Sequence, residues 1–158
     1  MSRVLAREIP FAELRSEPVR SFDAYWRSKH RGDLLPRRQD IDPAEILGIL
    51  PVFILVDIEE EPFRIRYRLC GTRVSLLDEE LTGRYLDELK NTPLEEKERV
   101  LSLYRTAFAE RRPVYLRSIG ASKQTGNPLP MEGAIWPLSS DGQRIDKCAV
   151  VEDFPDLG

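Results

Sequence analysis

Histidine and cysteine are scarce in this sequence, which contains one histidine and two cysteines. The single histidine, His30, leaves no Ser-His-Asp or Cys-His catalytic set unless it takes part itself, and its sequence context gives no sign that it does. Cys70 and Cys148 lack the short spacing of a metal or redox motif, so we expect two free thiols. We therefore predict no catalytic residues and no metal site.

Long hydrophobic runs are also missing. No segment approaches the roughly 20 apolar residues that a membrane-spanning helix needs. Residues 1–20 lack the apolar centre of a secretory signal. With 41% hydrophobic and 32% charged residues, the composition is typical of a globular domain. We expect a cytoplasmic protein with no membrane partner.

Positive charge does not dominate the chain, whose formal net charge is −3. The distribution is uneven, because residues 1–38 are rich in Lys and Arg and residues 78–98 are rich in Asp and Glu. Such asymmetry can orient a charged partner, but solvated faces with no partner at all are the more common reason for it. The acidic balance and the lack of a groove-reading motif predict that this partner is not a nucleic acid.

Three segments carry signals for helix formation. A short helix is expected over about 21–32, where a capping residue precedes it and a glycine ends it. The run Asp42-Pro43-Ala44-Glu45 combines a cap, a proline and a returning carboxylate, and predicts a helix to about Leu50. Thr92-Pro93-Leu94-Glu95 repeats that pattern and predicts a longer helix that stops before Pro113.

Five segments are expected to form strands. Residues 52–58 are apolar at both odd and even positions, which indicates a strand covered on both faces. Residues 63–69 alternate strictly, which indicates a strand with one wet face. Three further strands are expected at about 114–120, 130–138 and 145–152. The connections are too short for parallel crossovers, so the sheet should be mainly antiparallel.

The chain is predicted to hold one domain with short ends. We expect an N-terminal arm over 1–19, a domain over 20–152 that includes the first helix, and a C-terminal tail over 153–158. No kinase, cyclase or helix-turn-helix segment is recognisable, so we expect no output domain.

The order of these elements resembles the PAS fold, in which two strands, a helical middle, a longer helix and three strands follow one another. The local sequence resembles the bacterial PAS_5 family over roughly residues 20–152. The segments that carry the resemblance are Asp40-Ile41-Asp42-Pro43, Leu50-Pro51, Phe63 to Thr72, Glu80 to Asp87 and Trp136 to Gly142.

This resemblance implies an α+β fold, with a five-stranded antiparallel sheet and helices on one face. The strand at 52–58 would be central, and the strand at 63–69 would lie at an edge. The row of arginines in that edge strand would discourage sheet-to-sheet aggregation. Either the N-terminal helix or a second subunit would cover the other face.

PAS domains enclose a pocket, and its cofactor is not identified by this sequence. Haem is not expected, because His30 lies outside the PAS core and no other axial ligand is evident. A flavin of the LOV type is not expected either, because neither cysteine has the Asn-Cys-Arg-Phe-Leu-Gln context. The predicted inward-facing residues, each of which could also be plain core, are Phe53, Leu55, Tyr67, Leu69, Tyr104, Phe108, Tyr115 and Trp136.

Two functions follow as hypotheses. The preferred one is a stand-alone PAS sensory or protein-interaction module that binds a small ligand, a signalling protein or both. It would associate through the N-terminal helix or the sheet face, most simply as a homodimer. The alternative is a small α+β pocket enzyme that uses a buried carboxylate, for which Asp57, Glu132 and Asp146 are the candidates.

Overall fold

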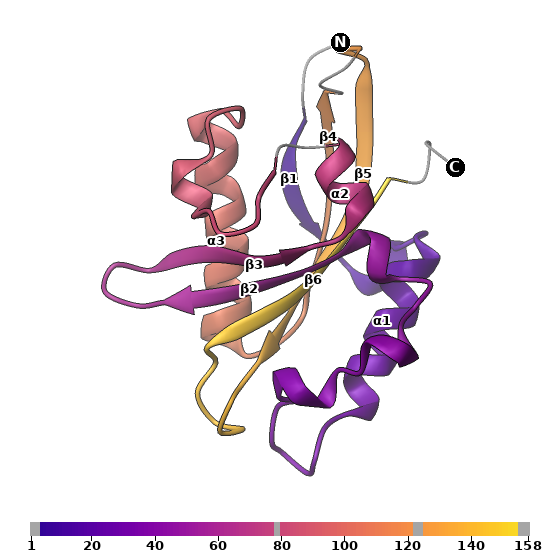
Figure 1. Cartoon of the computed structure of the whole chain (residues 1–158), viewed down its shortest axis with the longest axis vertical. Coiled ribbons are helices and arrows are strands. Elements are labelled where there is room, and N and C mark those ends of the chain that lie inside the picture. The colour runs from indigo at the N-terminus through magenta and orange to yellow at the C-terminus, as the bar shows by residue number, and fades with distance from the viewer. Residues whose placement is uncertain (1–3, 78–79, 122–124, 155–158) are drawn as a thin grey trace.

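The computed structural model of this chain describes residues 4–77, 80–121 and 125–154. Within these residues a six-stranded antiparallel sheet has the order β1-β4-β5-β6-β2-β3. Figure 1 shows this sheet between α3 on one side and α1 on another. In chain order the strands are β1 Val4–Ile9, β2 Phe53–Glu59, β3 Arg64–Cys70, β4 Val114–Ala121, β5 Pro128–Leu138 and β6 Lys147–Asp153.

The strand count differs from the expected five, because part of the predicted N-terminal arm is a strand. β1 pairs with β4, with Ile9 opposite Tyr115 and Glu8 opposite Leu116. A register shift between Val4 and Arg7 interrupts the ladder, so the buried residues Ala6 and Ile9 are three positions apart. This spacing hides the period of two by which a strand is recognised.

The two strands predicted at 52–58 and 63–69 are β2 and β3, and they form an antiparallel hairpin. β3 lies at the edge of the sheet, whereas β2 is interior, between β6 and β3, rather than central. The pairing shifts between Leu55 and Val56, so Arg68 is an extra residue in β3. This bulge breaks the expected alternation and turns Leu69 to the face that carries Leu55.

The helices are α1 Glu17–Ser28, α2 Thr72–Leu77 and α3 Leu94–Glu110. α1 begins earlier than predicted, because the Ser16 hydroxyl caps it by accepting from the Val19 N–H and Pro18 lies in its first turn. Asp42 caps the Ala44 N–H as expected, but only a 3₁₀ turn, Pro43–Glu45, follows it. The other 3₁₀ turns are Phe11–Glu13, Arg38–Asp40, Leu50–Val52 and Leu86–Glu88.

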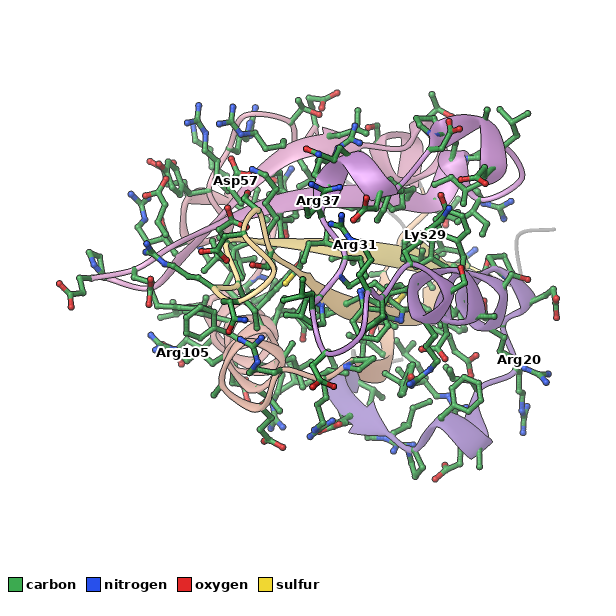
Figure 2. All side chains as sticks on the ribbon, turned by 90° about the horizontal axis from the view of Figure 1, so that it is seen from below. Arg20, Lys29, Arg31, Arg37, Asp57 and Arg105 are labelled. Atoms are coloured by element: carbon green, nitrogen blue, oxygen red, sulfur yellow. The ribbon has the colours of Figure 1, made fainter. Side chains whose placement is uncertain are left out.

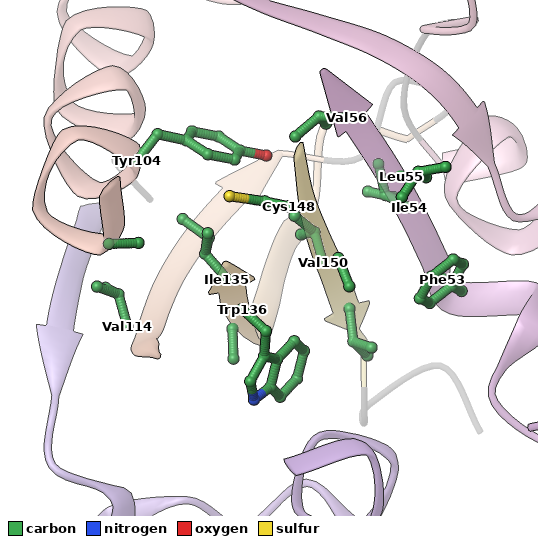
Figure 3. Close-up of a cluster of buried hydrophobic side chains, with 14 of the residues drawn as sticks. Phe53, Ile54, Leu55, Val56, Tyr104, Val114, Ile135, Trp136, Cys148 and Val150 are labelled. Carbon is green, nitrogen blue, oxygen red and sulfur yellow. The ribbon is translucent and has the colours of Figure 1, made fainter. Parts of the chain in front are cut away.

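The long helix is present as predicted, although Pro93 rather than Thr92 precedes its first residue. α3 packs against one face of the sheet, which we call the α3 face; it carries Val56, Ile135 and Val150. α1 packs against the other, the α1 face, which carries Phe53 and Trp136. Figure 3 shows Tyr104 reaching from α3 towards the sheet and Trp136 pointing to the opposite side. None of the helices in the described residues is long and apolar enough to cross a membrane.

Candidate functional site

A cavity of about 170 Å³ lies between α3 and the α3 face of the sheet. Its wall is mostly apolar and includes Leu103 and Val100 from α3 and Leu116, Ile135 and Val150 from the sheet. The 3₁₀ turn Leu86–Glu88 and the loop that follows it close one side, where Asn91 is exposed. This space is partly open and mostly apolar, and such a space is the default candidate for a ligand site.

The strand registers determine which side chains reach this cavity. Ile135 of β5 pairs with Val150 of β6. Because neighbouring paired residues share a face, both point towards α3. Leu116 and Ser118 of β4 have the same parity and line the same cavity.

Two hydroxyl groups interrupt the apolar wall. Tyr104 on α3 is 3% exposed and Ser118 on β4 is 9% exposed. No hydrogen bond of either hydroxyl is found in the part of the chain that the structure describes, and neither oxygen is among its fully buried, unbonded side-chain atoms, so both keep accessible surface. Burial raises the pKa of the Tyr104 hydroxyl well above its ordinary value of 10.0. Tyr104 therefore stays protonated and can donate a hydrogen bond into the cavity.

Two of the eight pocket residues predicted from the sequence lie at the cavity, Tyr67 and Tyr104. Phe108 lies outside it, with its ring 5.4 Å from that of Phe63. Leu69 is 43% exposed because of the bulge at Arg68. The remaining four, Phe53, Leu55, Tyr115 and Trp136, are buried on the α1 face.

The sequence prediction missed Leu103, Leu116, Ser118, Ile135 and Val150. In β5 every residue from Glu132 to Leu138 is buried, so hydrophobicity does not show which parity faces α3. The prediction favoured the aromatic Trp136, whereas its neighbour Ile135 faces the cavity. Ile135 and Trp136 differ only in which of them faces α3, and the tertiary packing of β5 decides this.

Two of these residues on the α1 face, Tyr115 and Trp136, bond to a buried carboxylate. Asp23 of α1 is 4% exposed and accepts hydrogen bonds from the Tyr115 hydroxyl at 2.5 Å and the Trp136 Nε1–H at 3.0 Å. The Arg27 Nε–H donates to the other carboxylate oxygen at 2.8 Å. Burial, followed by the hydrogen bond to Asp23, raises the pKa of Tyr115 to about 12. This cluster joins α1 to β4 and β5.

The three carboxylates considered for an enzyme all lie away from the cavity. Glu132 accepts from the backbone N–H groups of Arg15 and Ser16 and pairs with Arg117 at 2.6 Å. Burial alone would raise the pKa of Glu132, but these partners outweigh it and the pKa lies below the ordinary value of 4.5.

Asp57 and Asp146 are likewise engaged in local contacts. Asp57 pairs with Lys147 and Arg68, and these cations overcome the effect of burial to lower the Asp57 pKa. Asp146 accepts from the backbone N–H and the hydroxyl of Ser140. Paired carboxylates outside a cavity are poorly placed for acid–base chemistry on a bound molecule.

Cys70 and Cys148 are free thiols, as expected. Neither lines the cavity, and burial raises the pKa of the Cys148 thiol. His30 lies at the end of α1, where its ring packs edge-on against Trp26. No group of three or more His, Cys, Asp or Glu residues within the described ranges could hold a metal ion.

Part of the basic excess of the N-terminal region is paired with carboxylates in the fold. Arg31 and Arg37 both contact Asp40, and Lys29 contacts Glu45. In Figure 2, Arg20 lies apart from the group around Arg31 and Arg37.

Two solved structures are similar to this chain at low scores. A fungal LOV-domain photoreceptor is similar at 16% identity, with 74% of this chain and 94% of that chain covered and a TM-score of 0.45. An RNA-binding light-oxygen-voltage receptor is similar at 14% identity, with 97% of this chain and 38% of that chain covered and a TM-score of 0.43. At these scores neither likeness supports a statement about function. No curated protein sequence matches the chain.

The comparison of the sequence with family models is decisive. The model of the PAS_5 family, described as a PAS domain, matches residues 14–149, most of the chain. The resemblance carried by the sequence segments is thereby confirmed, and the chain belongs to the PAS_5 family of PAS domains.

Proposed function

We propose that this PAS domain is a sensory module that binds a small molecule in the cavity under α3 and passes the change to a signalling partner. The observation that carries the proposal is the cavity of about 170 Å³, apolar except for a few polar groups that include the unbonded hydroxyls of Tyr104 and Ser118. Close-packed interiors leave few voids larger than a water molecule. An apolar space with a few polar groups on its wall is the usual form of a small-molecule site.

The proposed route from the cavity to the surface is short. Ile135 lines the cavity, and the next residue, Trp136, bonds to Asp23 of α1. Leu116 and Tyr115 of β4 form a second such pair. A ligand that shifts β4 or β5 would therefore move α1, because the Asp23 cluster ties the helix to both strands.

The proposed output surface is the outer side of α1, which a signalling protein or a second copy in a homodimer would contact. This arrangement is supported by the position of α1, which occupies the α1 face and presents Arg20 and Ala24 to solvent. A protein that sediments as a strict monomer would contradict the homodimer.

The cavity can be tested with a variant that fills it. Gly120 lines the cavity, and a Cβ atom added there would meet nothing nearer than the Leu129 carbonyl oxygen at 4.0 Å. Gly120→Leu is therefore expected to occupy the space at little cost to the fold. Gly48→Leu is the matched control, because a Cβ at the exposed Gly48 has no neighbour within 4 Å and the residue is remote from the cavity.

The measurement is native mass spectrometry of the purified proteins, followed by ligand-observed NMR with a mixture of small fragments. We expect the wild type and Gly48→Leu to retain or bind a small molecule and Gly120→Leu to bind none. Binding by Gly120→Leu at wild-type strength, or no binding by the wild type in either assay, would contradict the proposed function.

A further inference from the structure

The size of the cavity limits what it can hold. Its volume of about 170 Å³ is close to that of an engineered protein cavity, of about 150 Å³, that binds benzene. A molecule of about one ring with a short substituent therefore fits.

The charges on the cavity wall limit the ligand further. The described part of the wall contains no Lys, Arg or His, and its charged residues are Glu96 and Glu152. An anionic ligand would meet carboxylates and no cation, which is unfavourable in an apolar space. Both glutamates already take part in interactions within the protein, so they provide no reason to assign a cationic ligand.

The hydroxyls of Tyr104 and Ser118 indicate which polar group the ligand carries. Tyr104 and Ser118 are both more than nine-tenths buried, and both line the cavity. Neither hydroxyl oxygen is among the fully buried, unbonded side-chain atoms of the described residues, so both keep accessible surface, and an acceptor atom on a ligand in the cavity can bond to them. Tyr104 projects from α3 towards the sheet in Figure 3, in the direction of the strands that form the opposite wall.

We propose that the cavity selects a small, uncharged, largely apolar molecule of about one ring, whose carbonyl or similar oxygen accepts hydrogen bonds from Tyr104 and Ser118. This inference rests on the proposed function, since it names the chemical class of the ligand at the same cavity. Tyr104 and Ser118 are then the residues that set specificity, and the apolar wall supplies most of the affinity.

Four probes of similar size test this class on the full chain. Acetophenone carries a neutral acceptor, ethylbenzene carries none, benzoate is an anion and benzylamine is a cation. Their dissociation constants are measured by NMR titration. We expect acetophenone to bind about 3- to 10-fold more tightly than ethylbenzene, the usual net effect of a neutral hydrogen bond. Benzoate and benzylamine are expected to bind more weakly than either.

Two conservative variants identify the donors. Tyr104→Phe and Ser118→Ala each remove a hydroxyl that has no hydrogen bond in the described structure, so both are expected to fold normally. Combining them should weaken acetophenone binding about 3- to 10-fold and leave ethylbenzene binding unchanged. The preference for the acceptor should then disappear.

The outcomes separate this inference from the proposed function. Equal binding of acetophenone and ethylbenzene, or tightest binding of benzoate or benzylamine, overturns the ligand class while leaving a ligand-binding cavity in place. An acceptor preference that survives in the double variant overturns the roles of Tyr104 and Ser118. No binding of any probe, in a wild type that also retains no molecule, contradicts the proposed function itself.

Discussion

The two sides of the sheet differ in how many hydrogen bonds their buried polar side chains form. Under α1, the Asp23 carboxylate is bonded to Tyr115, Trp136 and Arg27, and aromatic rings pack around it. Under α3, the hydroxyls of Tyr104 and Ser118 border a cavity of about 170 Å³. The same strands build both faces, because successive residues of β4 and β5 point to opposite sides.

This difference indicates that one side of the sheet holds the fold rigid and the other is suited to binding. The Asp23 cluster under α1 has satisfied polar groups and close ring contacts, which favour a single rigid arrangement. The α3 face gives up packing and hydrogen bonds, a cost that is tolerated where a site serves binding. The contrast can be tested by removing matched groups from each side.

The largest effect is expected from Phe22 at the centre of the α1 face. Its side chain is fully buried, and its ring centre lies 4.6 Å from that of Trp136 and 5.5 Å from that of Phe53. Phe22→Ala should lower the free energy of unfolding by about 3–5 kcal/mol. Leu103→Ala on the cavity side should cost about 2 kcal/mol, the low end for such a change, because Leu103 already borders open space.

Urea denaturation followed by the fluorescence of the two tryptophans measures both variants. Equal losses for Phe22→Ala and Leu103→Ala would show that the α3 side is packed as densely as the α1 side. The contrast between the faces would then be wrong.

A smaller effect with a defined pH dependence is expected at Glu132, beside the start of α1. The pKa of Glu132 is lowered in the folded chain, because Arg117 and two backbone N–H groups outweigh the effect of burial. The unfolded chain therefore binds more protons at acidic pH. The stabilisation is complete above the ordinary pKa of 4.5 and is lost as the pH falls through the lower, folded value.

Glu132→Gln should cost about 1.5–3 kcal/mol at pH 7, the usual range for hydrogen bonds to a charged group. The difference in stability between the wild type and this variant should shrink as the pH falls below about 4.5. Glu98→Gln is the control, because Glu98 is exposed and its substitution should be neutral at every pH. A constant difference between wild type and Glu132→Gln from pH 7 to pH 3 would contradict the assignment.

Much of the fold could be predicted from the sequence. The five predicted strands and the long helix are present, because period, proline positions and short polar connections are local signals. Strand β1 was missed because its register shift separates the buried residues by three positions. The start of α1 was placed too late, although Ser16 and Pro18 form a cap-and-proline pattern like that recognised at Asp42 and Pro43, with one residue between the cap and the proline.

The cavity was less predictable than the fold. Aromatic residues were favoured as pocket residues because of their size and polar tips, yet Trp136 and Tyr115 bond to Asp23 on the opposite face. A strand buried on both faces gives no local sign of which parity meets which helix. The bulge at Arg68, which exposes Leu69, is set by pairing with β2 and is equally invisible in the sequence of β3 alone.

The smallest effect gives the sharpest comparison, because it uses the same substitution on both faces. Tyr115→Phe removes a hydroxyl that donates to Asp23 and accepts from Arg27 Nη2 at 3.1 Å, and it should cost about 1–3 kcal/mol. Tyr104→Phe removes a hydroxyl with no hydrogen bond in the described structure, and it should change stability by less than about 0.5 kcal/mol. Urea midpoints of the two variants measure the difference. A loss at Tyr104→Phe as large as that at Tyr115→Phe would mean that the Tyr104 hydroxyl is already bonded in solution, and the α3 face would then be as saturated as the α1 face.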